Sequence, residues 1–521
     1  MGKLKHVNSI DLQGAIAQGC QTMQRVFNAD DDNIPFFKSV LAPEARLSFN
    51  ASHSESHVPG RHLNALLAAE AVAGVEIDEQ AVHHHARAAF FSFSGPLPLP
   101  LNRQVIGGPL VNFLPHNTRE GMHALYALAR YRDSGQARGI AERMIATVMR
   151  MWHPRRRWDR RDFERWGLVL GEKDNFIFGE ARLIGPLVKY YRATGNGSAL
   201  ELALALKQKA VDEFFRDDGG YDPEIFGSHV HSTTSVMSSL AQLADLMGDA
   251  TLMNRVRAFY DNGLQQVRDP LGWSIESSIC PDENTDLGES NNTGDIVETA
   301  LILGRWGYPG CFHDAERIVR AHLLPSQLQD TSFIVEPPNP EGADGKRRLA
   351  ERHLGAFGTP APYGHRPVGF DRVIFNMDIV GGAVGSLCEV VRESTRFDQA
   401  GHRVNLLFDR RTPEIEVASP YTQDGLRITV KRPGPLFVRI PPWVDREALS
   451  LAGHDGRWRF AGEHLFIPKP RVDAPITVFF DRPMQEIVLK HRLRDIRVRL
   501  RGDEVVAMDN FGADLTFFDP Y

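Results

Sequence analysis

Acidic, imidazole and amide side chains recur just before, or within the first turn of, stretches that have helical periodicity. Three carboxylates among them are the predicted catalytic groups: Glu276, Asp295 and Asp378. Hydrolysis of a glycosidic bond needs a proton donor for the leaving oxygen and a second carboxylate that acts as nucleophile or activates water. The predicted sugar-binding residues can hydrogen-bond to hydroxyl groups. They are His53, His57, His116, Arg119, Asp174, His229, His231, Asn292, Asp371 and Arg372.

Each of these residues also has an ordinary structural explanation, because Asn, Asp and His cap helices and form buried hydrogen bonds. Asp295 stands at the start of a helix expected over 295–306. Its carboxylate either caps this helix or stays ionised near the positive helix end, which suits a base or nucleophile. The recurrence of such groups at one predicted end of the protein is what favours a site.

The segment from His53 to His57 has two histidines and a glutamate at alternate positions. A helical zinc site needs His at i and i+4 with a Glu next to the first His, whereas Glu55 stands at i+2, on the opposite face. An extended segment would still bring the three side chains to one side. We predict no metal site and no other cofactor.

A sequence repeat predicts the scaffold that positions these residues. Apolar helical patterns are interrupted at nearly regular spacing by short turns that contain Gly74, Gly135, Gly195, Gly248 and Gly307. Each unit is expected to be a helical hairpin, in which the glycine takes a positive φ where the first helix ends.

Five hairpins and two further helices, expected at 11–27 and 378–393, give twelve helices in six pairs. The turns within pairs are short and the connections between pairs are long, which favours a closed six-fold α/α barrel over an open solenoid. The long connections are expected at one end of the barrel, where long loops commonly carry function. They span 91–118, 153–178, 217–229, 269–292 and 325–377.

After residue 395 the sequence changes to alternating and β-branched runs, separated by turn signals such as the Arg-Pro-Gly-Pro segment at 432–435. These runs predict an antiparallel β-sandwich. The predicted domains are a six-fold α/α barrel over 1–395 and a β-sandwich over 396–521. The fold class is therefore mainly α with a β appendage.

Composition excludes several classes of protein. The chain has 521 residues, of which 42% are hydrophobic and 24% charged, so a globular protein is expected rather than a disordered, collagen-like or coiled-coil one. Its formal net charge is −6 with both signs interleaved, which predicts no binding to nucleic acid or to an anionic membrane. Four cysteines without a C-x-x-C pair predict reduced thiols.

The N-terminus shows no signal peptide, and no apolar run is long enough to span a membrane. This predicts a cytoplasmic protein, although a chain trimmed of its signal would look the same. The predicted partner is an oligosaccharide or glycoside, and a homodimer is compatible with the sequence.

The order of the predicted parts resembles the β-L-arabinofuranosidase superfamily of glycoside hydrolases. The local similarities are TGDIVETALIL after Asn292, VRAHLLPSQ at 319–327, FNMDIVGGAVGSL at 375–387 and PLFVRIPPWV at 435–444. The resemblance extends over most of the chain from about residue 120. It implies an α/α barrel followed by a β-sandwich, and a hydrolase activity on glycosides.

The chain departs from this family at the catalytic cysteines. The resemblance implies a zinc-bound cysteine nucleophile, from a Glu-Thr-Cys motif and a paired-cysteine motif. The corresponding segments here, 292–295 and 376–378, contain no thiol, and Cys280 and Cys388 lie at other positions. Carboxylates are therefore expected to replace the thiolate. By the same resemblance, Glu276 lies near the place of the family's acid/base glutamate.

Together these observations predict an exo-acting glycoside hydrolase that removes a terminal sugar, a furanoside or a uronic acid, from a plant or microbial glycan with paired carboxylates. Arg61, Arg119 and Arg372 adjoin the predicted site, and arginine can hold the carboxylate of a uronic acid with two parallel hydrogen bonds. The alternative for these arginines is a structural ion pair with Glu120 or Asp371.

Two other functions fit the same scaffold. In a polysaccharide lyase or a sugar epimerase, a His or Tyr abstracts a proton next to a carboxylate, so His229, His231 and Tyr363 would be the important residues. A catalytically silent carbohydrate-binding protein would need no paired acids. The number of carboxylates at the predicted site favours hydrolysis over binding alone.

Overall fold

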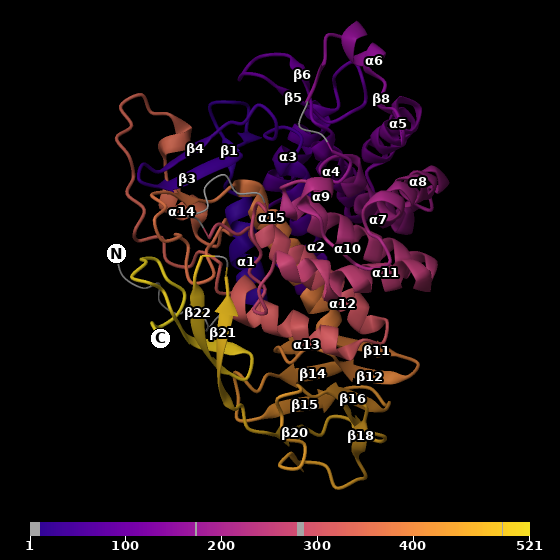
Figure 1. The fold of residues 1–521 in the computed structure, drawn as a ribbon, viewed down its shortest axis with the longest axis vertical. Coiled ribbons are helices and arrows are strands. Elements are labelled where there is room, and N and C mark those ends of the chain that lie inside the picture. Colours follow the sequence, from indigo (N-terminus) through magenta and orange to yellow (C-terminus); the bar gives the residue numbers. More distant parts are fainter. Residues whose placement is uncertain (1–10, 172–174, 279–285, 492) are drawn as a thin grey trace.

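The computed structural model describes residues 11–171, 175–278, 286–491 and 493–521. Within these ranges, twelve helices have ten residues or more, and they form six pairs (Figure 1). The inner helices are α2 (Val58–Ala73), α4 (Thr118–Tyr131), α7 (Ile184–Thr194), α10 (Val230–Met247), α12 (Ser290–Arg305) and α15 (Met377–Ser394). The outer helices are α1 (Leu12–Met23), α3 (Glu79–Ser92), α5 (Gly135–Met151), α8 (Gly197–Glu213), α11 (Ala250–Asp261) and α13 (Pro309–Ile318).

The inner helices form a closed ring. Each packs against the next in chain order, from α2 through α4, α7, α10 and α12 to α15, and α15 returns to pack against α2. An open solenoid has no contact between its first and last units. The contact between α15 and α2 therefore confirms the six-fold α/α barrel.

Glycine ends several of the inner helices as the repeat predicts. Gly74, Gly195 and Gly248 follow α2, α7 and α10 with φ of 65°, 72° and 65°, values that an L side chain rarely adopts. The prediction is wrong for Gly135, which is the first residue of α5. There Asp133 takes the left-handed conformation, with φ of 51°.

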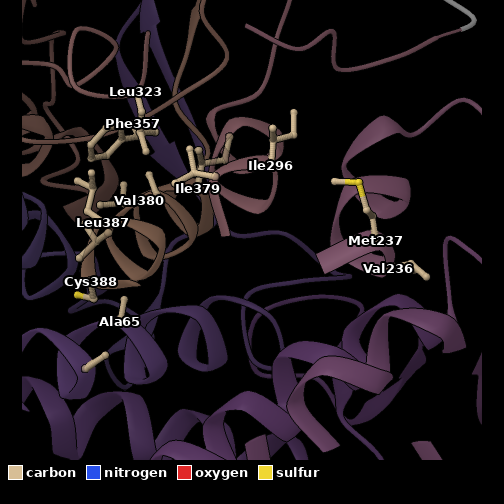
Figure 2. Close-up of a cluster of buried hydrophobic side chains, with 14 of the residues drawn as sticks. Ala65, Val236, Met237, Ile296, Leu323, Phe357, Ile379, Val380, Leu387 and Cys388 are labelled. Carbon is tan, nitrogen blue, oxygen red and sulfur yellow. The ribbon is translucent and has the colours of Figure 1, made fainter. Parts of the chain in front are cut away.

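The apolar residues of the inner helices form the core of the barrel wall, and Figure 2 shows part of it. Ala65 of α2, Met237 of α10, Ile296 of α12 and Leu387 of α15 have no exposed surface. Polar residues lie on the other face of these helices, which points into the barrel. Asp295, next to Ile296 in α12, contacts Arg119 of α4 and His231 of α10 there. The wall of the barrel is thus apolar and its interior polar.

Helices α2 and α4 approach so closely at Gly60 that a side chain does not fit. A Cβ atom on Gly60 would lie 1.8 Å from the carbonyl oxygen of Glu120. Gly60→Ala is therefore expected to lower the free energy of unfolding by about 1–3 kcal/mol or more, because the backbone of α4 must move. Gly135→Ala is the control, since a Cβ atom there meets nothing within 4 Å. Equal melting temperatures for the two variants would contradict this expectation.

Two five-stranded sheets form the β-sandwich that follows α15. One sheet, in spatial order, contains β11 (Thr395–Asp398), β12 (Gly401–Val404), β16 (Leu436–Arg439), β19 (His464–Ile467) and β18 (Arg459–Ala461). The other contains β13 (Arg410–Arg411), β14 (Ile415–Ala418), β15 (Leu426–Val430), β20 (Ile476–Phe479) and β17 (Ser450–Ala452). The pairs are antiparallel as predicted, except that β12 and β16 run parallel. The predicted fold class, an α/α barrel followed by a β-sandwich, is confirmed.

The last three strands form a separate sheet that packs on the barrel. They are β21 (Met484–Lys490), β22 (Asp495–Arg501) and β23 (Glu504–Met508). Ile496, Val498 and Val505 belong to the same buried apolar cluster as the barrel helices, whereas the sandwich has an apolar core of its own. We keep residue 395 as the proposed domain boundary, because α15 ends at Ser394 and β11 begins at Thr395. The final sheet then attaches the end of the chain to the barrel.

The long connections between helix pairs contain short strands at the end of the barrel away from the sandwich (Figure 1). One sheet joins β10 (Val373–Ile374), β3 (Lys38–Ala42) and β4 (Arg46–Ser48), and another joins β5 (Leu101–Arg103), β6 (Leu110–Phe113) and β9 (Val169–Leu170). These connections also contain two hairpins, β1 (Phe27–Asn28) with β2 (Ile34–Pro35) and β7 (Trp152–His153) with β8 (Arg157–Trp158). They contain three short helices as well, α6 (Arg160–Arg165), α9 (Pro223–Phe226) and α14 (Leu349–His353). No described helix has both the length and the apolar character that crossing a membrane requires.

Candidate active site

Side chains from the N-terminal ends of the inner helices meet at the loop end of the barrel. His57, before α2, lies 3.2 Å from Asp378 of α15, and its ring stacks on that of His116, before α4, at 5.2 Å between centroids. His116 in turn lies 5.6 Å from His229, before α10. His53 completes this group of rings, 5.0 Å from His57. The structure therefore brings together residues that are far apart in the sequence.

Among the described residues predicted to bind sugar, Asp371, Arg372 and Asn292 do not join this group. Asp371 and Arg372 lie in the connection before β10, where their side chains are 84% and 54% exposed and pair with each other at 3.6 Å. Asp174 lies outside the described residues. The side-chain amide of Asn292 is fully buried and donates to the carbonyl oxygen of Ile275 at 2.8 Å. It therefore holds in place the connecting segment that contains Glu276.

Glu276 is held by its backbone, and its carboxyl group has no partner among the described residues. Its carbonyl oxygen accepts from the amide of Val230 at 3.1 Å, and its own amide donates to Leu287 at 2.9 Å. The side chain is half-buried and makes no hydrogen bond or ion pair with other described residues. Burial raises the pKa of this carboxyl group, which favours the protonated form.

Asp378 faces an imidazole whose orientation the structure fixes. The Asn117 side chain donates through Nδ2 to the carbonyl oxygen of Ser52 at 2.5 Å, so Asn117 Oδ1 is the atom that faces His57 Nδ1 at 3.0 Å. His57 Nδ1 must therefore carry a proton, and His57 Nε2 faces Asp378 Oδ2. Burial alone would raise the pKa of Asp378, but its contact with His57 outweighs this and lowers the pKa to about 2.

Glu289 is a buried carboxyl group between the other two. Burial raises its pKa to about 8, and the charges of Asp378 and Glu276 add to this, while the hydrogen bond from Asn291 and the charge of Arg61 oppose it. His231 Nδ1 lies 3.6 Å from Glu289 Oε1. Glu289 is thus protonated at neutral pH and can donate a hydrogen bond.

The raised pKa of Glu289 has a consequence for stability. In the unfolded chain a glutamate ionises near pH 4.5, so the folded protein loses stability relative to the unfolded chain as the pH rises from about 4.5 through 8. Glu289→Gln removes this ionisation. Its melting temperature, relative to that of the wild type, is expected to be higher at pH 9 than at pH 5. A difference that does not change between these two pH values, measured by scanning calorimetry, would contradict the assignment.

A layer of buried charges lies directly below these residues. The carboxylate of Glu120 is fully buried, accepts hydrogen bonds from Arg119 at 3.1 Å and Arg182 at 3.0 Å, and forms an ion pair with Arg61 at 3.2 Å. Burial tends to raise the pKa of Glu120, but the guanidinium groups, Arg182 first, and His57 hold it well below its usual range. Arg119 also reaches Asp295 at 3.4 Å. We call Glu120, Arg61, Arg119, Arg182 and Asp295 the charge layer.

Two predicted site residues contact this layer. His231 accepts at Nε2 from Arg61 Nη2 at 3.0 Å and lies 3.3 Å from Asp295 Oδ2. Asp295 also accepts from Thr234 Oγ1 at 3.3 Å, and burial raises its pKa to about 6. Arg182 was not among the predicted residues. It lies in the turn Glu180–Leu183, just before α7, the same position relative to its helix that His116 and His229 have before theirs.

Comparisons with known proteins bear on the fold. No protein-family model matches the sequence, and no curated protein matches it significantly. The solved structures similar to it include a GH127 β-L-arabinofuranosidase from Geobacillus stearothermophilus T6, at 15% sequence identity and a TM-score of 0.57 over 86% of this chain and 75% of that one. A second GH127 β-arabinofuranosidase has 14% identity and a TM-score of 0.60, over 94% of this chain and 79% of its own.

A third structure, described as a glycoside hydrolase, has 12% identity and a TM-score of 0.57, over 86% of this chain and 76% of that one. At these identities the similarity concerns the arrangement of the backbone. It agrees with the resemblance that the sequence motifs indicate, and it spans both the barrel and the sandwich. The chain therefore shares the fold of the GH127 β-L-arabinofuranosidases.

Proposed function

We propose that the protein is a glycoside hydrolase in which Glu276 donates a proton to the leaving oxygen and Asp378 acts as nucleophile or base. The observation that carries this proposal is the contrast between the two carboxyl groups. Glu276 is half-buried, without a partner among the described residues, and burial raises its pKa and so favours the acid form, whereas Asp378 lies 3.2 Å from an imidazole nitrogen. Two carboxyl groups in different environments are what glycoside hydrolysis requires.

The other carboxyl groups receive different roles in this proposal. Glu289, protonated at neutral pH, is a hydrogen-bond donor for a sugar hydroxyl between the two catalytic groups. Asp295, the third carboxylate of the sequence-based prediction, holds Arg119 and His231 in the charge layer. We propose that it positions these residues rather than reacting with the substrate.

The structure supports a neutral sugar as substrate. Arg61 and Arg119 are engaged by Glu120, and Arg119 also by Asp295, while Arg372 is exposed beside Asp371. None of these three arginines offers a free guanidinium group for the carboxylate of a uronic acid. The similar fold of two β-arabinofuranosidases makes a terminal furanoside the substrate class to test first.

The charge layer also supports exo action. Glu120 and Arg182 are fully buried and pair with each other at 3.0 Å below the candidate site. A substrate chain therefore enters from the loop end and stops at this layer, so its terminal sugar is the one that reaches Glu276 and Asp378. The lyase or epimerase hypothesis is less well supported, since Tyr363 is 1% exposed, with its hydroxyl group bonded to Val368 and Asp286.

A screen of the purified protein against aryl glycosides tests this proposal. Release of the aryl group from an arabinofuranoside or another neutral furanoside is expected, with no product that absorbs in the near ultraviolet as an unsaturated sugar does. Arg372→Ala is expected to change kcat/KM by no more than about twofold, as for an exposed substitution. Cleavage of glucuronides that Arg372→Ala abolishes would overturn the neutral substrate, and an unsaturated product would overturn hydrolysis.

A further inference from the structure

We propose that a basic surface at the loop end of the barrel binds the acidic part of a polysaccharide whose neutral terminal sugar enters the candidate active site. This surface, which we call the basic patch, consists of the exposed residues Arg155, Arg156, Arg160, Arg165 and Trp166. The inference rests on the proposed function, because the hydrolase proposal places the terminal sugar at Glu276 and Asp378. It adds the chemical class of the chain to which that sugar is attached.

The segment 155–165 is strongly basic in an acidic protein. It contains six arginines and three acidic residues, whereas the whole chain has a formal net charge of −6. Two of the three acids are already engaged, since Asp159 pairs with Arg161 and Asp162 pairs with Arg150. The four arginines of the basic patch form no ion pair with other described residues. Their guanidinium groups can therefore bind an anion from outside the protein.

Buried aromatic rings hold the basic patch next to the candidate site. The patch comes from the turn between β7 and β8 and from α6 with the residue that follows it. Trp158 of β8 and Phe163 of α6 are buried, and their rings lie 5.0 and 5.3 Å from the ring of Phe113, at the end of β6. Phe113 precedes His116 of the site by three residues, so their Cα atoms are at most about 11 Å apart. The patch is thus fixed beside the site at the loop end (Figure 1).

Trp166 adds an apolar face to the charges of the patch. It is 49% exposed, and the guanidinium group of Arg165 lies 5.5 Å from the centre of its ring. An exposed indole ring can stack on the C–H face of a sugar, whereas arginine binds a carboxylate with two parallel hydrogen bonds. An exposed aromatic ring beside arginines that have no counter-charge therefore fits a chain of uronic acids, in which each unit offers both groups.

The direction of the substrate chain agrees with this surface. Because the charge layer stops the terminal sugar, the remainder of the chain must leave the site at the loop end, where the basic patch lies. The terminal sugar itself meets arginines that Glu120 already engages, so it stays neutral while the carboxylates of the remainder reach the patch. An anionic membrane fits less well, since a membrane on this end would cover the place where substrate enters.

Binding to polygalacturonate tests the inference on the full chain. Native gels that contain this polymer are expected to retard the protein, whereas gels with the fully methyl-esterified polymer, which carries no charge, are not. The patch variant R155Q/R156Q/R160Q/R165Q is expected to bind at least about tenfold more weakly, because four exposed charge pairs are lost. Trp166→Ala is expected to weaken binding by about two- to tenfold.

The matched control removes four exposed arginines from the sandwich and so changes the net charge equally. This control is R427Q/R446Q/R457Q/R459Q, and it is expected to bind polygalacturonate like the wild type. No retardation of the wild type, or equal weakening in the patch variant and the sandwich control, would overturn the basic patch. Tighter binding to phosphatidylserine vesicles or to a DNA oligonucleotide than to polygalacturonate would overturn the glycan as its ligand.

A small aryl furanoside measures the proposed function separately, because it is too short to reach the patch. The patch variant is expected to cleave it with a kcat/KM within about twofold of the wild type, as for exposed substitutions. Cleavage of this glycoside by a protein that does not bind polygalacturonate would support the hydrolase and overturn the patch. Binding of polygalacturonate that depends on the patch, without cleavage of any glycoside, would support the surface and count against the hydrolase.

Discussion

Glu276→Gln is expected to lower kcat on a furanoside substrate by at least about 10²-fold and to leave the melting temperature nearly unchanged. The carboxyl group of Glu276 makes no hydrogen bond or ion pair within the described part of the chain, so its loss removes no structural contact there. Its raised pKa matches the role of a proton donor, and glutamine cannot donate a proton to the leaving oxygen.

The leaving group of the substrate provides a sharper measurement of the same role. A good leaving group, such as dinitrophenolate, needs little protonation, so Glu276→Gln is expected to lose much less activity on that glycoside than on one with a poor leaving group. Glu224→Gln is a matched control, because Glu224 is an exposed glutamate at the start of α9. An equal loss on both substrates would show that Glu276 is not the acid, and full activity of the variant would remove it from the site.

Glu120→Gln is expected to destabilise the protein by about 3–5 kcal/mol, because it leaves buried guanidinium groups without their shared counter-charge. Arg61, Arg119 and Arg182 all form ion pairs with Glu120, and Arg182 is fully buried like Glu120 itself. A neutral amide cannot compensate three positive charges removed from water. Denaturant unfolding of the variant and of the wild type measures this difference.

The control for Glu120→Gln is Glu70→Gln, on α2 of the same barrel. Glu70 also pairs with an arginine, Arg132, at 2.8 Å, but its side chain is 38% exposed. Exposed pairs contribute about 0–1 kcal/mol, so this variant should be nearly as stable as the wild type. Similar losses of stability in the two variants would mean that burial does not decide the importance of the charge layer.

The sequence alone predicted the scaffold, because the scaffold depends on patterns local to each segment. A helix with an apolar stripe must bury that stripe, and a short turn such as that at Gly195 makes the next helix its neighbour. Repetition of this unit then leaves few arrangements, and closure followed from the contrast between short and long connections. Alternation in runs such as 426–430 predicted strands in the same way. The gathering of the long connections at one end of the barrel followed from these patterns as well.

The short strands of the long connections could not be predicted, since segments of two to five residues such as β10 are too short to show a period. The packing partner of the last sheet could not be predicted for another reason. The alternation of β22 requires an apolar partner for Ile496 and Val498 but does not say which one, and the barrel rather than the sandwich provides it.

Sequence also identified that carboxylates and imidazoles gather at one end, because each follows or begins a helix. It could not say which of them face one another. Glu276 lies in the connection before α12 and Asp295 lies within this helix, yet among the described residues the Glu276 carboxyl group has no partner, whereas Asp295 lies between Arg119 and Thr234. Contacts between residues hundreds of positions apart depend on how the ring closes and on which charges are buried together. Only the tertiary structure therefore decided which acid is paired with buried charges and which acid has no partner among the described residues.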